Sequence, residues 1–141
     1  MLIENRQYED EKTLSKDLEG TVLRYCSIKD ISIDGGNVDA TFIGCEFQNL
    51  DWYWGLFNTS LFADVTFKNC IFRGTAFSGC RFIDCSFVGC RFMKDNLDSP
   101  CTFDDSKWFD CKVEHCEGLP SDAFFNSSLD TDAKARQLAR R

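Results

Sequence analysis

Residues 60–92 decide the fold of this chain. They read SLFADVTFKNCIFRGTAFSGCRFIDCSFVGCRF, and an aromatic residue returns at every fifth position. Traced back to residue 42, the series holds eleven consecutive aromatic positions: Phe42, Phe47, Trp52, Phe57, Phe62, Phe67, Phe72, Phe77, Phe82, Phe87 and Phe92. A helix repeats every 3.6 residues and a strand every two, so a period of five fits neither. The pattern therefore predicts an internal repeat.

A second position of the repeat lies two residues before each aromatic residue, and its occupants are mostly small. They are Ala40, Cys45, Leu50, Gly55, Ser60, Val65, Cys70, Thr75, Cys80, Cys85 and Cys90. Residues two apart share one face of an extended segment, so both positions are expected to point into the core. Gly, Asn and Asp cluster between the units, where the chain must turn. Each unit is therefore predicted to be a short strand followed by a turn.

The repeat continues in both directions with two irregularities. Upstream it runs through Leu23, Ile28, Ile33 and Val38, and it slips by one residue near residues 36–40. Downstream, Leu97 keeps the count with Asp95 in the small position, one residue is inserted around Ser99–Pro100, and the pattern resumes at Phe103, Trp108 and Val113. Residues 21–118 are thus predicted to be the repeat. Residues 1–20, which fit no repeat, are predicted to form an N-terminal cap, and residues 119–141 a C-terminal helical cap with Phe124 and Phe125 as candidate plugs.

This combination of periods and residue types resembles the pentapeptide-repeat family, in which four repeats form one square turn. The resemblance implies an all-β fold: a right-handed parallel quadrilateral β-helix of about five coils with a short C-terminal helix. At about 4.8 Å between coils, the rod would be roughly 24 Å long. Stacked coils can bury a continuous aromatic ladder, which no single coil could bury alone.

The composition bounds the partners. The chain has 141 residues and a formal net charge of −7, so it lacks the basic footprint of a nucleic-acid-binding protein. An acidic protein is steered toward basic partners. The N-terminus does not read as a signal peptide, and no apolar run approaches the length of a membrane-spanning helix. We therefore expect one cytoplasmic domain that binds neither nucleic acid nor membrane directly.

The cysteines and the single histidine do not form a pattern typical of an enzyme. All nine Cys fall in the small inward position, where Cys serves as a small buried hydrophobe. Cys70, Cys90 and Cys111 are expected to stack one coil apart, as are Cys80 and Cys101. Zinc sites need closer Cys pairs than these. His115 is the only histidine, and no nucleophile and acid accompany it in a known motif. We expect no catalytic residue, no metal and no cofactor.

The outward positions are therefore the candidate partner-binding site. Columns should repeat every twenty residues, which aligns Asp64 and Asp84 with Asp105 beyond the insertion. Beside this acidic ladder runs an apolar strip, so the predicted site comprises Asp64, Asp84, Asp104, Asp105, Ile43, Ile83 and Leu61. A different column carries Arg73, Arg91 and Lys94. Turns favour Asp in any protein, so the same acids also fit a purely structural role.

Three functions remain open, and all of them require a protein partner. The first hypothesis is an inhibitor, such as an immunity protein that neutralises a basic, nuclease-type toxin, since an acidic inhibitor associates quickly with a basic partner. The resemblance implies the alternative, a DNA mimic that binds and protects DNA gyrase or another topoisomerase, and such mimics dimerise through a C-terminal helix. A scaffold or effector is the third. Monomer and homodimer both stay possible.

Overall fold

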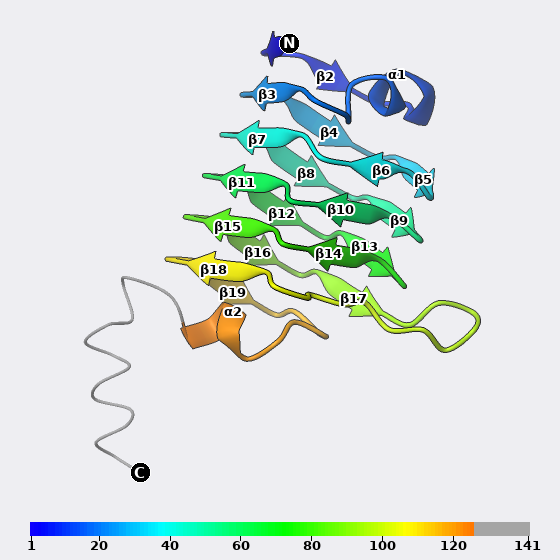
Figure 1. Ribbon diagram of the computed structural model, residues 1–141, viewed down its shortest axis with the longest axis vertical. Coiled ribbons are helices and arrows are strands. Elements are labelled where there is room, and N and C mark those ends of the chain that lie inside the picture. The colour runs from blue at the N-terminus through cyan, green and yellow to red at the C-terminus, as the bar shows by residue number, and fades with distance from the viewer. Residues whose placement is uncertain (126–141) are drawn as a thin grey trace.

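The computed structural model describes residues 1–125, and Figure 1 shows a stack of short parallel strands that descends from the N-terminus. Strands in the same place of successive coils pair with one another and build four parallel sheets, which we name A to D. Sheet A contains β1 (Leu2–Glu4), β3 (Val22–Arg24), β7 (Thr41–Ile43), β11 (Leu61–Ala63), β15 (Arg81–Ile83) and β18 (Lys107–Phe109). The expected all-β parallel solenoid is confirmed.

The other three sheets follow sheet A in chain order around each coil. Sheet B contains β2 (Gln7–Tyr8), β4 (Ser27–Lys29), β8 (Glu46–Gln48), β12 (Thr66–Lys68), β16 (Ser86–Val88) and β19 (Lys112–Glu114). Sheet C contains β5 (Ser32–Asp34), β9 (Asp51–Tyr53), β13 (Ile71–Arg73) and β17 (Arg91–Met93). Sheet D contains β6 (Asn37–Val38), β10 (Leu56–Asn58) and β14 (Ala76–Ser78). Within the described residues, two short helices complete the elements, α1 (Glu11–Ser15) and α2 (Asp122–Phe125).

The centre of each strand supplies the core, as the five-residue period predicts. Each of the eleven aromatic residues from Phe42 to Phe92 is at most 8% exposed. Rings stack along a sheet, so that Phe62 and Phe82 lie 4.9 Å apart at an angle of 3°, and Phe67 and Phe87 lie 4.6 Å apart at 3°. Stacked ring pairs add about 0.5–1.5 kcal/mol to the burial of their area. The aromatic ladder therefore holds successive coils together.

The small inward position also makes hydrogen bonds between coils. The thiol of Cys85 donates to the carbonyl of Phe62 at 3.2 Å, and the hydroxyl of Ser106 donates to the carbonyl of Phe77 at 2.8 Å. Thr75 bonds to Trp52 in the same way at 3.2 Å. A residue in this position must be small because it sits between coils, and Cys, Ser and Thr add a donor that Ala lacks. This role of the Cys residues was not predicted.

The coil length changes at the two places where the repeat is irregular. Most successive strands are offset by 20 residues, as in the pairing of Leu61 with Arg81. The coil that begins at Val22 has 19 residues because Val22 pairs with Thr41, which confirms the predicted slip. Arg81 pairs with Lys107, an offset of 26. The predicted single-residue insertion is wrong: residues 94–99 leave the coil as a loop, and Leu97 is 73% exposed.

The N-terminal segment belongs partly to the solenoid. Ile3 pairs with Leu23 and Tyr8 with Ile28, so residues 2–8 form half of a first coil rather than lying outside the repeat. The expectation that residues 1–20 fit no repeat is therefore wrong for their first half. The remaining half of the coil is closed by α1 and the turn after it, which place Leu14 and Leu18 in the core (Figure 1).

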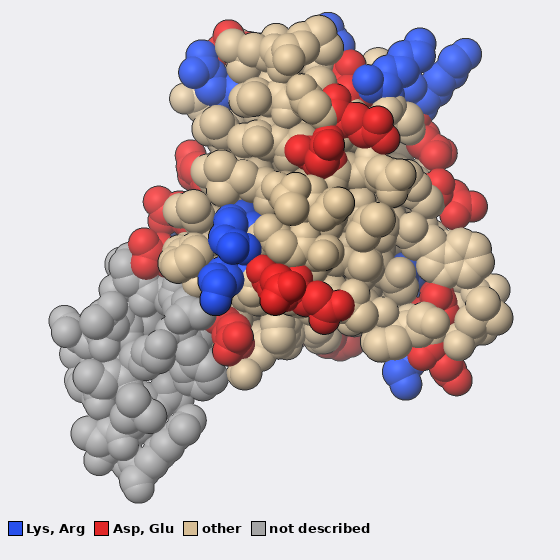
Figure 2. Space-filling view, in the orientation of Figure 1, with Lys and Arg blue, Asp and Glu red and all other residues tan. Residues whose placement is uncertain are grey.

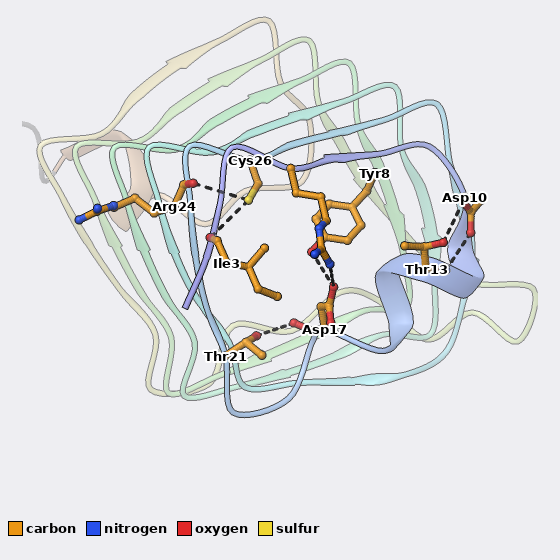
Figure 3. Close-up of polar contacts among 9 residues, drawn as sticks. Ile3, Tyr8, Asp10, Thr13, Asp17, Thr21, Arg24 and Cys26 are labelled. Carbon is orange, nitrogen blue, oxygen red and sulfur yellow. Dashed lines mark hydrogen bonds and ion pairs between the residues drawn. The ribbon is translucent and has the colours of Figure 1, made fainter. Parts of the chain in front are cut away.

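One buried carboxylate ties this first coil together, as Figure 3 shows in a view along the solenoid. Asp17 is only 7% exposed and accepts hydrogen bonds from the hydroxyl of Tyr8 at 2.7 Å and from Arg6 at 2.9 Å. Burial is the main cause that raises the pKa of Tyr8, and the hydrogen bond to Asp17 raises it further. Asp10 caps α1 by accepting from the backbone N–H of Thr13 at 2.8 Å. The end of the core is therefore closed by a satisfied polar network.

The last coil is closed by the segment that follows β19. Gly118 lies so close to Phe92 that a side-chain carbon there would collide with the Phe92 carbonyl, and its φ of +87° also favours glycine. Leu119 packs on the core and Ala123 of α2 is fully buried. The side chains of Phe124 and Phe125 and the helix predicted beyond them lie outside the described residues. In residues 1–125 no helix has the length and apolarity needed to cross a membrane.

Candidate interaction surface

The four corners of the coil position the outward charges. Where one strand of a coil turns into the next, a single residue takes a left-handed backbone conformation, with φ near +55° to +65° at most corners. Gly, Asn and Asp adopt this conformation most readily. The corner between sheets B and C contains Asp30, Asn49, Asn69, Gly89 and His115, so asparagine and glycine meet the same backbone requirement without charge.

The corner between sheets A and B is where aspartates gather. It contains Asn5, Tyr25, Gly44, Asp64, Asp84 and Asp110 in successive coils. In Figure 2 acidic atoms lie along the left edge, where β11, β15 and β18 end in Figure 1. Asp64 and Asp84 are exposed and Asp110 is half-buried. We name Asp64, Asp84 and Asp110 the acidic corner.

An apolar strip runs beside the acidic corner on the outer face of sheet A. It consists of the last residues of successive strands, Ile43, Ala63, Ile83 and Phe109, with Leu61 next to Ala63. Ile83 is 38% exposed and Phe109 is 45% exposed. At its upper end, the ring of Tyr25 covers Gly44 so closely that a Cβ there would lie 2.7 Å from the ring. Apolar and acidic side chains thus share one side of the rod.

The predicted site is assembled only in part. Asp64, Asp84, Ile43, Ile83 and Leu61 do lie together. Asp104 and Asp105 do not extend their columns, because the carbonyl of Asp104 accepts from the N–H of Gly79 and so places both acids at the corner between sheets D and A. The six-residue loop shifts the register by more than the single residue that was assumed.

Two residues of the surface were missed for the same reason. Phe109 and Asp110 continue the columns of Ile83 and Asp84, since Ile83 pairs with Phe109 and the N–H of Asp84 bonds to the Phe109 carbonyl. A signal was available in the sequence. The unit centred on Leu97 has Asp95 in a position reserved for small residues, and excluding this unit aligns Trp108 with Phe82.

The two arginines of sheet C, Arg73 and Arg91, both form ion pairs. Arg73 and Arg91 lie on sheet C but in different columns, since Ile71 pairs with Arg91 and Arg73 pairs with Met93, which corrects their predicted alignment. Arg73 contacts Asp51 at 3.3 Å, and Arg91 contacts Glu117 at 3.5 Å. These exposed pairs contribute little to stability. Sheet C is therefore mixed in charge.

The loop at residues 94–99 is pinned to sheet C rather than extended into solvent. The indole of Trp54 donates to Asp95 at 2.6 Å, and Asp95 also accepts from the N–H groups of Leu97 at 2.8 Å and Ser99 at 2.9 Å. The N–H of Ser99 is the main cause that lowers the pKa of Asp95, with Trp54 contributing. Tyr53 and Asn96 bond to each other beside it. The loop thereby walls a groove on sheet C.

Cys45, Cys80 and Cys85 are placed for packing rather than for reaction. Burial raises the pKa of Cys45 and of Cys80 to about 11, and it raises the pKa of Cys85 further. A reactive thiol has a lowered pKa and an electropositive, accessible setting. The predicted stacks change with the register: Cys90 is followed by Cys116, not Cys111, and Cys80 by Ser106, not Cys101.

The described residues assemble no metal-binding group. Within residues 1–125, no cluster of three or more His, Cys, Asp and Glu side chains is placed to hold a metal ion. His115 is an exposed corner residue with a φ of +54°.

Comparisons with known proteins agree with this architecture. The model of the pentapeptide repeat region matches residues 60–123. QnrB1, a plasmid-mediated fluoroquinolone resistance protein, has a similar structure, with a TM-score of 0.62 and 11% identity over 84% of this chain and 70% of that chain. Rfr23, a pentapeptide-repeat protein from the cyanobacterium Cyanothece 51142, aligns over 84% of this chain and 85% of that chain with 9% identity and a TM-score of 0.42. No curated protein matches the sequence.

The structural similarity to QnrB1 shows a common fold. Because the sequence identity is only 11%, this similarity does not show a common function. The family model, the five-residue period and the four parallel sheets all describe the same repeat. Residues 60–123 therefore match a pentapeptide repeat region, and the fold of the described residues is that of a pentapeptide-repeat solenoid.

Proposed function

We propose that this chain is a non-enzymatic protein-binding module whose acidic corner and sheet A strip bind the DNA-contacting surface of a topoisomerase. The observation that carries the proposal is the acidic corner. Its three aspartates stand one above another in consecutive coils, at about the 4.8 Å spacing of paired strands.

The charge at this corner is not required by the backbone. Asn49 and Asn69 hold the same left-handed conformation at the neighbouring corner. Like charges stacked at this spacing repel one another, so three aspartates are an unfavourable choice for folding alone. A basic partner surface removes that repulsion on binding and accelerates association. The arrangement therefore favours a cationic partner.

The kind of cationic partner is argued from the shape and the charge. Residues 1–125 contain 21 Asp and Glu and 12 Lys and Arg, a net charge of −9. Over about 24 Å this is roughly one charge per 3 Å, while duplex DNA carries one per about 1.7 Å. The chain is therefore a partial electrostatic match to DNA. Ile83 and Phe109 add apolar contact area that a phosphate backbone lacks. A protein groove built to hold DNA fits a rod with this acidic edge.

The choice of topoisomerase rests on family resemblance. QnrB1 is described as a fluoroquinolone resistance protein. The resemblance to the pentapeptide-repeat family implies protection of DNA gyrase, since some members of that family have this role. The inhibitor of a nuclease-type toxin requires the same kind of basic partner surface, but neither the family match nor the structural likeness supports that role. The toxin-inhibitor role is therefore kept only as an alternative result of the binding test.

The test is binding to purified DNA gyrase, measured by biolayer interferometry at low and moderate salt, together with a supercoiling assay in the presence of a quinolone. The triple variant Asp64→Asn, Asp84→Asn, Asp110→Asn retains residues that tolerate the corner conformation. We expect it to bind roughly tenfold or more weakly than the natural chain, since three charge contacts are lost.

The matched control removes three acids from sheet B and its corner, through Asp30→Asn, Glu46→Gln and Glu114→Gln, so the net charge changes equally. Unchanged binding by this control places the contact at the acidic corner. Equal weakening by both variants would show a general charge effect and contradict the proposed surface. Failure of the natural chain to bind gyrase would exclude the topoisomerase, and a basic toxin recovered from lysate through the acidic corner would replace it.

A further inference from the structure

A second site lies on sheet C, across the solenoid from the apolar strip of sheet A. A groove of about 560 Å³ runs between the strands of this sheet and the loop at residues 94–99, which follows β17 (Figure 1). Its lining combines the ring of Tyr53 with three carboxylates, two cationic side chains and an amide. The volume falls within the range of about 300–1,000 Å³ that small-ligand sites occupy.

The aromatic ring of the groove is held in place before any ligand arrives. The hydroxyl of Tyr53 donates to the side-chain carbonyl of Asn96 and accepts from the backbone N–H of Asn96 at 3.1 Å. Trp54 packs against Tyr53 with ring centres 4.6 Å apart, and of these two rings only that of Tyr53 lines the groove. A preformed site avoids the entropic cost of ordering side chains on binding.

The charges of the groove offset one another. Arg73 contacts Asp51 at 3.3 Å, and Asp95 already accepts hydrogen bonds from three N–H groups. Asp34 and Lys94 make no ion pair within residues 1–125, and their charges are opposite. Because the lining holds three acids and two bases, an anion and a cation would each meet like charges there. A neutral ligand avoids this repulsion.

The polar groups of the groove offer both halves of a hydrogen bond. The carboxylates of Asp34 and Asp51 accept, whereas Arg73 and Lys94 donate. A hydroxyl group both donates and accepts, so it can bond to an acid and a base together. Hydrogen bonds to charged side chains are stronger than those between neutral groups. The groove therefore suits a neutral ligand that is rich in hydroxyl groups.

The register of sheet C sets the length of that ligand. Asp34 pairs with Tyr53, and Tyr53 pairs with Arg73, so the three residues form one column across two strand spacings. This distance of about 10 Å is close to the length of two sugar rings joined in a row. Tyr53 lies at the middle of the column and offers an apolar ring surface to the C–H face of a sugar.

We propose that this groove binds a neutral disaccharide whose two pyranose rings carry equatorial hydroxyl groups. Equatorial hydroxyls project from the edge of a sugar ring, which leaves its faces apolar. One face packs on Tyr53, while the hydroxyls at the edges bond to Asp34 at one end and to the Asp51–Arg73 pair and Lys94 at the other. The site does not include the acidic corner, so it adds a ligand to the proposed protein-binding function.

The experiment titrates the protein with cellobiose and follows the backbone amide signals by NMR. We expect saturable shifts at residues 32–34, 53, 73 and 94–96. Sucrose, a neutral disaccharide of the same mass whose second ring is a furanose, should bind roughly tenfold more weakly. No saturable shift up to about 50 mM cellobiose, or equal affinity for the two sugars, would overturn the proposal. The titration involves no topoisomerase, so its result is independent of the proposed function.

Two charged analogues with the same linkage test the neutrality of the ligand. Cellobiuronate carries a carboxylate, and the β-1,4-linked dimer of glucosamine carries two ammonium groups. Each should bind more weakly than cellobiose, because each meets like charges in the groove. Tighter binding of either analogue would contradict a neutral ligand.

Two variants of Tyr53 separate the ring from the hydroxyl that holds the loop. Tyr53→Phe loses the bonds to Asn96 but keeps the ring, and it should bind cellobiose within about threefold of the natural chain. Tyr53→Leu loses both and should bind roughly tenfold more weakly. Equal affinities of the two variants would show that the ring does not contact the sugar.

Asp34 distinguishes recognition of a hydroxyl from recognition of a charge. Asp34→Asn keeps an acceptor and adds a donor, so it should retain most of the affinity for cellobiose, whereas Asp34→Ala should lose it several-fold. Glu114→Gln, which changes an exposed carboxylate of sheet B, should have no effect. Full affinity in Asp34→Ala would exclude Asp34 from the site and contradict the assigned position of the ligand.

Discussion

The indole of Trp54 donates a hydrogen bond of 2.6 Å to the carboxylate of Asp95, which lies 41 residues later in the chain. Trp54 occupies the corner after β9, and Asp95 opens the loop that follows β17. The bond therefore joins two separate coils through a side chain rather than through strand pairing. A six-residue excursion from the repeat is thus held against the solenoid.

Asp95→Asn should release this loop. The amide keeps the size of the carboxylate but loses the charge that strengthens its bonds to Trp54 and to the N–H groups of Leu97 and Ser99. We expect faster hydrogen exchange at residues 97 and 99, measured by NMR, with little change elsewhere. Unaltered exchange at both amides would show that the loop is fixed by other contacts.

The same carboxylate predicts a dependence on pH. The pKa of Asp95 is lowered, chiefly by the N–H of Ser99, so its contribution is complete above the ordinary carboxyl pKa and is lost as the pH falls through the lowered value. Protection of the loop amides should therefore decline on acidification. In Asp95→Asn the decline should be absent, and a persistent decline would assign it to another group.

Phe72→Ala tests the aromatic ladder. Phe72 is fully buried and stacks on Phe92 at 5.0 Å, so its loss removes buried area and leaves a cavity between coils. We expect the free energy of unfolding to fall by about 3–5 kcal/mol in urea titrations. Leu97→Ala, at an exposed loop position, should change it by less than about 0.5 kcal/mol. Similar losses in both variants would contradict the assigned register.

Asp84 separates the backbone role of a corner residue from its charge. Asp84→Asn should unfold within about 0.5 kcal/mol of the natural chain, because asparagine tolerates the left-handed conformation. Asp84→Val should cost about 1–2 kcal/mol, because a β-branched side chain is strongly disfavoured at positive φ and valine has no polar group to form the local hydrogen bonds of Asp or Asn. Thermal and urea unfolding measure both. If the valine variant is as stable as the natural chain, the backbone at residue 84 must be able to leave the left-handed conformation at little cost.

The buried thiols predict loss of stability in alkali. The pKa of Cys45 and Cys80 is raised to about 11 by burial, while an unfolded thiol ionises near 8.5. The unfolded chain therefore binds fewer protons than the native chain between these values, and stability falls as the pH rises through them. The urea midpoint, measured in steps from pH 7 to about pH 11, should decline above about pH 9.

Two substitutions isolate the thiol contribution to that decline. Cys80→Ser introduces the residue that occupies the same position in the two adjacent coils, Ser60 and Ser106. Cys85→Val introduces the residue found at this position in the preceding coil, Val65. The double variant should remain folded at pH 7 and lose less stability in alkali than the natural chain. An identical decline would assign the effect to other groups, such as the buried Tyr8.

The sequence alone determined the repeat and the inward columns. A period of five excludes simple helices and strands, and the resemblance to the pentapeptide-repeat family implied the square coil, whose stacking buries the Phe residues at every fifth position. The acidic and apolar positions at Asp64, Asp84, Ile43 and Ile83 followed from the same count, because every intervening unit has five residues.

Only the tertiary structure decided which residues lie next to one another beyond residue 93. Leu97 imitates a repeat unit by its spacing, yet the bonds of Asp95 to Trp54 and of Tyr53 to Asn96 draw that segment out of the coil. These contacts join residues more than 40 positions apart, and no local period records them. The loop length then displaces every later column, which is why Asp110 and Phe109, rather than Asp105 and Asp104, complete the surface.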